Sequence, residues 1–278
     1  MQKPGDLGKA SSFSRKTLED WQGKAPSEIG MMTADQNILV HGKDMLNWLV
    51  HNIDLCQNLH FFIRKEIPSP QVTTVLKSII MALNLPDIRV WPIGAVGLSG
   101  AAGTTCGAGL AAGILGFEGT VFGTFAIEGA CQLLEEAQFA LERGITLELF
   151  LDQWLKSGKI AFGFGRPVFS SDERIPVVLK IARENGLGNG EWLRLALEME
   201  KILRARKGLI MNFGCLLSAL LMEIGYTRAE ILVLSNFFPL INFLGVFHEY
   251  SKQRVPIFSL SCKDIEYSGP SPRMRKKK

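Results

Sequence analysis

Residues Ile160–Arg174, IAFGFGRPVFSSDER, combine two glycines, a proline and a run of charged residues within one short segment. Gly163 and Gly165 can adopt positive φ angles and permit close backbone approach, and Pro167 stiffens the exit from the turn. One interpretation is an ordinary loop, because glycine and proline punctuate loops in many proteins. The other is a backbone surface that a ligand approaches closely.

The charged end of this segment predicts the start of a helix. The sequence SSDER precedes an apolar run, so we expect Ser170 or Ser171 to act as the N-cap. Asp172, Glu173 and Arg174 form a compact charge cluster in the predicted first turn.

Composition indicates a folded chain with a substantial core. The chain has 278 residues, of which 47% are hydrophobic and 21% charged, which suffices for one large domain or for a large domain and a small lobe. The net charge is +4, and much of it lies in the C-terminal residues Arg273, Arg275, Lys276, Lys277 and Lys278. The rest is nearly neutral, so we expect no nucleic-acid partner.

The cysteines show no metal or disulfide pattern. They are scattered and odd in number, at Cys56, Cys106, Cys131, Cys215 and Cys262. Without a CxxC pair, this distribution predicts free thiols in a reducing compartment and no metal site. Residues 1–16 lack the apolar core of a secretory signal, so we expect a cytoplasmic protein.

Hydrophobic periodicity predicts a mainly helical fold. Ile38–Val40 reads as a short strand and turn that leads into a helix at about Met45. Between Met45 and Leu85 the apolar spacing predicts a helical hairpin, which is broken at Pro68–Pro70. Two further helices are expected after the charge cluster, the second of them over EWLRLALEMEKILRARK, 191–207.

Residues Val90–Phe117 carry no charge at all. Their length would permit a membrane span, and they contain two GxxxG spacings. Glycine and alanine outnumber leucine, isoleucine and phenylalanine, and Pro92 interrupts the first turn, so the gain from lipid burial is small. We therefore expect a helix buried in protein and keep membrane insertion as an alternative.

The order of motifs resembles that of the citrate synthase and citryl-CoA lyase family. The family signature GxGHPVY, followed by Asp-Pro-Arg, corresponds to the Gly163–Arg174 stretch of this chain. Arg166 stands at the histidine position and Phe169 at the tyrosine position. The spacing of the motif residues is preserved, while the histidine and the tyrosine of the family motif are replaced by other residue types.

Two further family motifs are also altered. In the Gly-x-x-His-Gly-Gly element, whose histidine contacts the thioester, this chain has Phe122 and then Gly123; lyase-type relatives can carry an aromatic residue there. In the Asn-Val-Asp element, Asn212 matches while Gly214 replaces the catalytic aspartate. Asn242 aligns best with the arginine that holds the organic acid.

The resemblance covers about residues 21–270 and implies an all-α, citrate-synthase-like homodimer. It implies a large helical domain of residues 21–156 and 212–270 and a small lobe of residues 157–211. The ends, 1–20 and 271–278, are expected to be a flexible tail and a basic tail.

The resemblance also implies the site. Substrate-binding positions would be Phe122, Gly123, Arg166, Arg174, Asn212, Gly214 and Asn242, and CoA-binding positions Gly163, Gly165 and Pro167. Family chemistry makes or breaks a carbon–carbon bond next to a thioester with one aspartate and two histidines, each worth about 10²–10⁴ in rate. Because Gly214, Phe122 and Arg166 occupy these places, ordinary citrate synthase activity should be negligible.

Arg166 has two interpretations. A guanidinium cannot act as a general base, yet it can hold a carboxylate or enolate oxygen through paired hydrogen bonds. It can equally cap a helix or pair with Asp172 or Glu173.

Two functional hypotheses follow. The first is a rewired enzyme that binds an acyl-CoA or acyl-carrier thioester and a small organic acid, with Arg166, Glu128 and Cys215 as candidate catalytic residues. The second is a catalytically silent homologue that acts as a partner or regulatory subunit, as a homodimer or with a paralogue. Neither needs a permanently bound cofactor or metal; the CoA thioester would be a substrate.

Overall fold

A computed structural model describes residues 23, 27–120, 122–166, 171–253 and 262–270. Pro167, Phe169 and Ser170 lie outside the described residues, as do both predicted tails. The chain divides into two compact units. Unit 1 consists of Met1–Leu85 and Phe117–Ile241, and unit 2 of Pro86–Gly116 and Asn242–Lys278.

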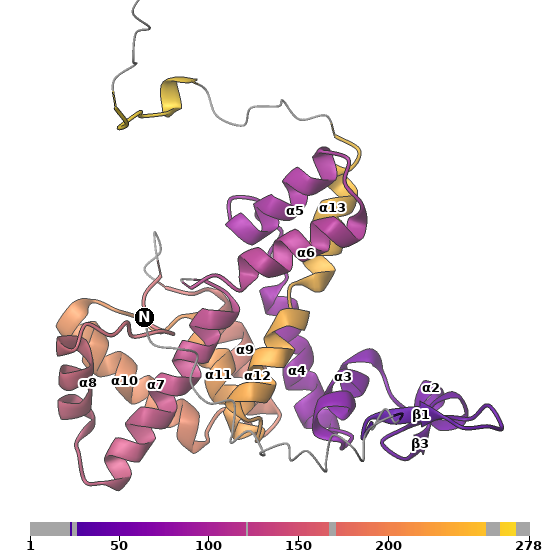
Figure 1. The fold of residues 1–278 in the computed structure, drawn as a ribbon. Coiled ribbons are helices and arrows are strands. Elements are labelled where there is room, and N and C mark those ends of the chain that lie inside the picture. Colours follow the sequence, from indigo (N-terminus) through magenta and orange to yellow (C-terminus); the bar gives the residue numbers. More distant parts are fainter. Residues whose placement is uncertain (1–22, 24–26, 121, 167–170, 254–261, 271–278) are drawn as a thin grey trace, which may run out of the picture. The chain divides into compact units, whose positions relative to one another are not determined.

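Helices dominate the described residues, which confirms the all-α fold class (Figure 1). The helices are η1 (Met45–Leu49), α2 (Val50–Asn52), α3 (Leu55–Arg64), α4 (Pro70–Leu83), α5 (Trp91–Ala101), α6 (Cys106–Phe117), α7 (Thr124–Glu142), α8 (Leu147–Lys156), α9 (Arg174–Glu184), α10 (Glu191–Lys207), α11 (Phe213–Glu223), α12 (Arg228–Phe237), α13 (Leu240–Tyr250) and η2 (Cys262–Asp264). The predicted helical hairpin corresponds to α3 and α4, and the second predicted helix after the charge cluster is α10.

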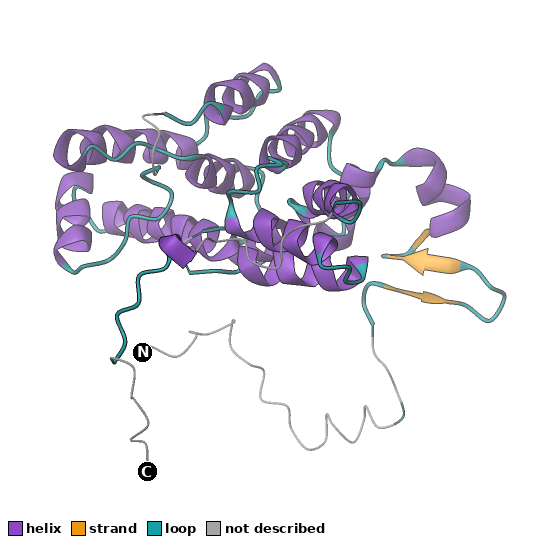
Figure 2. Ribbon diagram, turned by 90° about the horizontal axis from the view of Figure 1, so that it is seen from above, coloured by secondary structure: helices purple, strands orange, loops and turns teal. Residues whose placement is uncertain are grey.

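The strands of the described residues form one small antiparallel sheet within residues 30–44 (Figure 2). Its order is β1 (Gly30–Met32), β2 (Ile38–Val40) and β3 (Lys43–Asp44). In this register Met31 faces Leu39, and Leu39 also faces Asp44. The predicted strand at Ile38–Val40 is confirmed as β2.

Local capping signals fix several helix starts. Asp54 and Gln57 form a reciprocal capping box at α3, and Thr227 and Glu230 form another at α12. These side chains satisfy backbone N–H groups that have no partner within the helix. The N-cap of α9 is Glu173, without a side-chain cap bond, so the prediction of Ser171 as cap is wrong.

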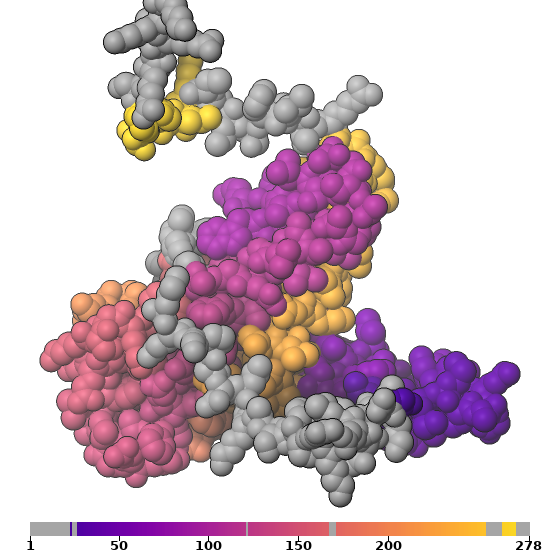
Figure 3. All heavy atoms as spheres, viewed as in Figure 1, coloured from indigo at the N-terminus to yellow at the C-terminus, as the bar shows by residue number. Residues whose placement is uncertain are grey.

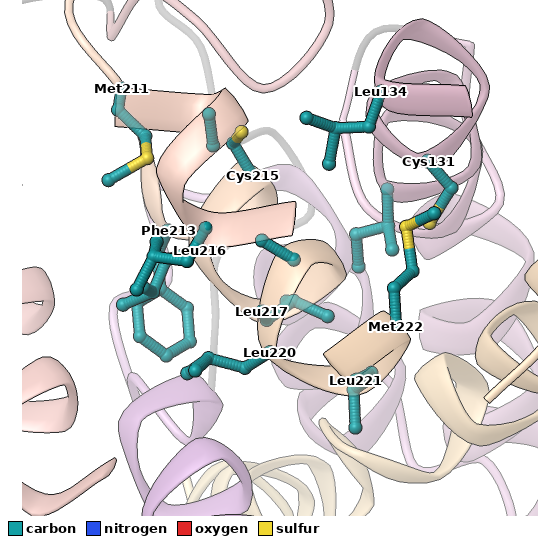
Figure 4. Packing of buried hydrophobic residues seen from close by; sticks show 14 of the residues in the cluster. Cys131, Leu134, Met211, Phe213, Cys215, Leu216, Leu217, Leu220, Leu221 and Met222 are labelled. Atoms are coloured by element: carbon teal, nitrogen blue, oxygen red, sulfur yellow. The ribbon is translucent and has the colours of Figure 1, made fainter. Parts of the chain in front are cut away.

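The core of unit 1 is centred on α11 (Figure 4). The residues from Cys215 to Leu221 all have 0% exposure. A helix that is apolar on every side is stable only when other elements surround it. Here α7, α9, α10 and α12 all contact α11.

The predicted small lobe, 157–211, belongs to unit 1 in the structure. Its helix α10 buries Leu193 and Met199 completely, in the same core cluster as α11. Whether these residues move as a separate lobe stays a prediction.

The uncharged stretch Val90–Phe117 forms two helices rather than the single buried helix that we expected. They are separated by a turn in which Gly103 has a φ of 77°, a conformation that glycine adopts without steric cost. Neither α5 nor α6 approaches the roughly 20 residues that a membrane helix needs.

Within unit 2, α6 packs closely on its neighbours. A Cβ atom at Gly113 would lie 2.4 Å from the Val96 side chain and 2.8 Å from the Phe243 ring. These distances are too short for a side chain, so the close packing requires glycine at this position. The opposite side is open: Leu98 and Leu115 are 57% and 71% exposed on α5 and α6, which Figure 3 draws in purple. Dimerisation stays a prediction.

One helical stretch in the described residues, Arg228–Tyr250, is long and apolar enough to cross a membrane by length and composition. Half of its most apolar window is buried inside the protein. Core helices of soluble proteins have the same properties, so this is weak evidence for a membrane span.

A buried polar contact joins α3 to the turn between α11 and α12. The Tyr226 hydroxyl and His60 Nδ1 lie 2.6 Å apart, and both residues are 3% exposed. Burial is the largest influence on His60 and lowers its pKa, against the opposing effect of Glu66. Arg64 also faces this pair and donates to the Gly225 carbonyl at 2.6 Å.

This pKa shift predicts a loss of stability in mild acid. Because folding lowers the pKa of His60, the unfolded chain binds the proton first as the pH falls below about 6.5. The free energy of unfolding should therefore fall between pH 7 and 5, by at most about 1.4 kcal/mol per pH unit for this one group. Urea denaturation of wild type and His60→Gln would measure it. An equal pH dependence in both proteins would refute the assignment.

Candidate functional site

The glycine-containing loop between α8 and α9 is fixed to the segment that precedes α11. The Gly165 N–H donates to the Ile210 carbonyl at 2.6 Å, and the Asn212 N–H donates to the Gly163 carbonyl at 2.9 Å. The Asn212 side chain also donates to the Gly165 carbonyl at 3.0 Å. Residues 163–165 are therefore held against the segment before α11 by hydrogen bonds within the chain.

Gly163 and Gly165 are needed for conformation, with φ angles of 85° and 93°. A Cβ atom at Gly163 would lie 2.7 Å from that of Cys215 and 3.0 Å from that of Ala130. The close backbone approach that the sequence predicted is thus an approach to α11 and α7. The CoA-binding role of these glycines stays a prediction.

Four charged side chains form a cluster here, in which Arg166 contacts the carboxylates of both Asp172, at 3.6 Å, and Glu173, and Arg174 pairs with Asp172. Arg166 pairs with Glu173 in a two-pronged contact and also donates to the Ser171 carbonyl at 2.9 Å. Arg174 donates two hydrogen bonds to the Asp172 carboxylate, from Nε to Oδ1 at 2.8 Å and from Nη2 to Oδ2 at 2.7 Å.

Asp172 is the buried member of this cluster. Its side chain is 0% exposed, and its carboxylate accepts the Phe213 N–H at 2.9 Å. Burial alone would raise its pKa, but the hydrogen bond and charge of Arg174, with the Phe213 amide, lower it overall. Asp172 therefore stays ionised and ties the start of α9 to the start of α11.

Glu173 lies on the exposed side of the cluster. The hydrogen bond from Arg166 lowers its pKa to about 2. Each arginine thus has a carboxylate partner from its own segment, and the four charges cancel. Of the two interpretations of Arg166, pairing with Glu173 agrees with these contacts.

The N-terminus of α11 carries the position at which the resemblance places an aspartate. Asn212 is the N-cap, and its Oδ1 accepts N–H groups from Gly214 at 2.9 Å and Cys215 at 3.3 Å. A Cβ atom at Gly214 would meet Asn212 Oδ1 at 3.1 Å and Ile127 Cγ1 at 4.0 Å. Gly214 supplies no proton acceptor, and Asn212 acts as a helix cap.

The two candidate proton carriers differ in access. Burial raises the pKa of the Cys215 thiol far above its ordinary value, and that of neighbouring Cys131 to about 12. A buried, protonated thiol is a poor nucleophile or base. Glu128, on α7, is only partly buried and directly follows Ile127, the residue that faces Gly214.

Phe122 and Gly123 lie at the start of α7. The Phe122 ring is 41% exposed and meets Phe117 edge to face at 6.0 Å. Gly123 has a φ of 82°, and a Cβ atom there would lie 2.0 Å from the Phe117 carbonyl oxygen. Only glycine fits this position.

Unit 1 therefore contains Phe122, Arg166, Arg174 and Gly214, whereas Asn242 belongs to unit 2. Asn242 is 7% exposed. The expectation that it faces the same hollow as the others stays a prediction.

Comparisons with known proteins identify the fold. No family model and no curated protein matches the sequence. The citryl-CoA lyase of Hydrogenobacter thermophilus is similar in structure, with a TM-score of 0.76 and 21% identity, over 90% of this chain and 96% of that one. The Methanosaeta concilii ATP citrate lyase in complex with (3S)-citryl-CoA has a TM-score of 0.76 and 20% identity, over 98% of this chain and 46% of that one.

The citrate synthase of Thermotoga maritima is less similar, with a TM-score of 0.52 and 14% identity over 90% of this chain and 95% of that one. These likenesses show that the chain has a citrate synthase/citryl-CoA lyase-like fold, as the motif order predicted.

The charge cluster predicts a strong dependence on Asp172. Asp172→Asn keeps the shape of the side chain but leaves Arg174 without the negative charge of Asp172. It also places the amide NH₂ opposite an N–H donor of Arg174 or Phe213. We expect a loss of about 3 kcal/mol in unfolding free energy, near the lower end for a buried pair because Arg174 remains 25% exposed. Glu173→Gln, at a 67% exposed side chain, should cost less than about 1 kcal/mol. Urea denaturation that ranks the two variants in the opposite order would contradict this account.

Proposed function

We propose that the protein binds an acyl-CoA thioester through its citrate synthase/citryl-CoA lyase-like fold and serves as a binding or partner subunit without ordinary synthase turnover. The similar citryl-CoA lyase and the similar structure in complex with (3S)-citryl-CoA support the thioester class through their fold. The absence of ordinary turnover is proposed because both arginines of the site, Arg166 and Arg174, are paired with carboxylates of the chain itself.

This pairing decides the electrostatics of the site. An arginine that holds a substrate carboxylate must exchange its existing partner for it. Here the substrate would compete with Glu173 at Arg166, and with the fully buried Asp172 at Arg174. Displacing Asp172 would also break its bond to the Phe213 N–H. A small organic acid would therefore gain little, while a simple acyl thioester such as acetyl-CoA has no carboxylate at its reacting end.

Thermal denaturation with CoA, acetyl-CoA, citrate and oxaloacetate tests this proposal. A ligand at 100 times its dissociation constant stabilises the folded state by about 2.7 kcal/mol. We expect CoA and acetyl-CoA to raise the melting temperature and the two organic acids to leave it unchanged. Release of CoA from acetyl-CoA and oxaloacetate should be negligible. No response to either CoA compound, or turnover at an ordinary enzymatic rate, would overturn the proposal.

A second candidate is a rewired enzyme in which Glu128 takes a proton from the thioester. It rests on the position of Glu128 on α7, directly after Ile127, whose Cγ1 would lie 4.0 Å from a Cβ atom at Gly214. The Ser218 hydroxyl, 3.3 Å from the Ile127 carbonyl oxygen and 2.8 Å from that of Gly214, joins these two helices. A carboxylate can perform such general-base catalysis.

Exchange of the acetyl-CoA methyl protons in D₂O distinguishes this candidate. If Glu128 is the base, wild type should exchange these protons and Glu128→Gln should lose about 10²-fold or more in rate. The matched control is Glu142→Gln, at an exposed carboxylate near the end of the same helix. Equal exchange in both variants, or none in wild type, would reject Glu128 as a base.

A further inference from the structure

A groove of about 490 Å³ lies in unit 1 between α4 and α9, next to the charge cluster. Its apolar walls are Met81 and Ala82 from α4 and Val177, Val178 and Ile181 from α9. Met81 and Val177 are 69% and 59% exposed. These side chains therefore present apolar surface to water, which favours a ligand that covers it.

The charged residues of this groove already have partners. Lys77 lies 2.6 Å from the carboxylate of Asp54. Glu173 and Arg174, at the N-terminal end of the α9 wall, pair with Arg166 and Asp172. Charge recognition therefore adds little, and the groove suits an uncharged apolar group.

The size and position of the groove narrow the ligand class. Its volume falls within the range of about 300–1,000 Å³ that is typical of small-molecule sites. Glu173 and Arg174 line the groove and also belong to the cluster beside the candidate site. A chain that lies along α9 can therefore have one end at this cluster and its body against Val177 and Ile181.

We propose that the groove binds the linear, saturated acyl chain of a thioester, with the carbonyl end next to Glu173 and Arg174. This inference rests on the proposed function and names its substrate class, a medium-chain acyl-CoA in place of an acetyl or citryl one. The same chain chemistry also occurs in a free fatty acid, which the test separates.

Calorimetric titration of the full chain with butanoyl-, hexanoyl-, octanoyl- and decanoyl-CoA measures the effect of chain length. Each methylene that enters the groove should tighten the dissociation constant about fourfold, which corresponds to about 0.8 kcal/mol. Octanoate is titrated in parallel. Weaker binding of octanoate than of octanoyl-CoA supports the thioester as the source of the chain; equal or tighter binding would overturn that assignment.

Val177→Asp places a charge in the groove at an exposed position, so folding should be preserved. The matched control is Val233→Asp, at a valine on α12 that is 63% exposed and does not line the groove. We expect the dependence on chain length to disappear in Val177→Asp and to persist in Val233→Asp. Melting temperatures of the two free variants verify that both are folded.

The outcomes separate this inference from the proposed function. Binding of CoA and all acyl-CoAs with one affinity would overturn the groove and leave the proposed function in place. Octanoate binding that Val177→Asp abolishes, without binding of any CoA compound, would overturn the proposed function and the thioester assignment together. A change in molar mass by light scattering in Val177→Asp alone would mean that a second copy of the chain covers the groove, and would also overturn the inference.

Discussion

The buried carboxylate of Asp172 is the contact on which the candidate site depends. It binds Arg174 through two hydrogen bonds and accepts the first backbone N–H of α11, so one side chain joins the start of α9 to the start of the central helix. A buried ion pair stabilises a fold only when the geometry is good and the remaining polar atoms are satisfied. Both conditions hold here, because each Asp172 oxygen accepts a hydrogen bond from Arg174 and Oδ2 also accepts the Phe213 N–H. Arg174 also packs over the Phe213 ring at 4.8 Å.

The same arrangement limits the chemistry. A site that handles carboxylic acids needs cations available to the ligand and a base next to the reacting carbon. In this chain Arg166 and Arg174 are bound to carboxylates of their own segment, and α11 begins with a glycine at its second position. The Asn212 cap and the glycine turn are held by hydrogen bonds within the chain, and both arginines of the cluster are paired with carboxylates of the chain.

Much of the helical architecture follows from local sequence signals. Apolar spacing and turn residues predicted the helical hairpin, the long amphipathic helix α10 and the strand β2, since periodicity and capping are properties of short segments. The turn at Gly103 and the cap of α9 were misjudged. Gly103 stands in a run of small residues, and nothing in that run distinguishes it from the other glycines as the place where the helix breaks. At α9 the nearby Asp172 carboxylate does not cap the helix, because it is bound to Arg174 and to the first N–H of α11.

The sequence by itself indicated a mainly helical chain, because glycine, proline and helix spacing act locally, and the motif order, read directly from the chain, carried the resemblance that implied the fold class. It left Arg166 open between ligand binding and ion pairing, and it ranked Cys215 and Glu128 together. Only the tertiary structure decided that Cys215 is buried and that α9 meets α11, because these are long-range contacts that no short pattern encodes; the catalytic roles of these residues stay predictions. The groove between α4 and α9 is of the same kind, since its two walls are about a hundred residues apart in the chain and meet only through packing.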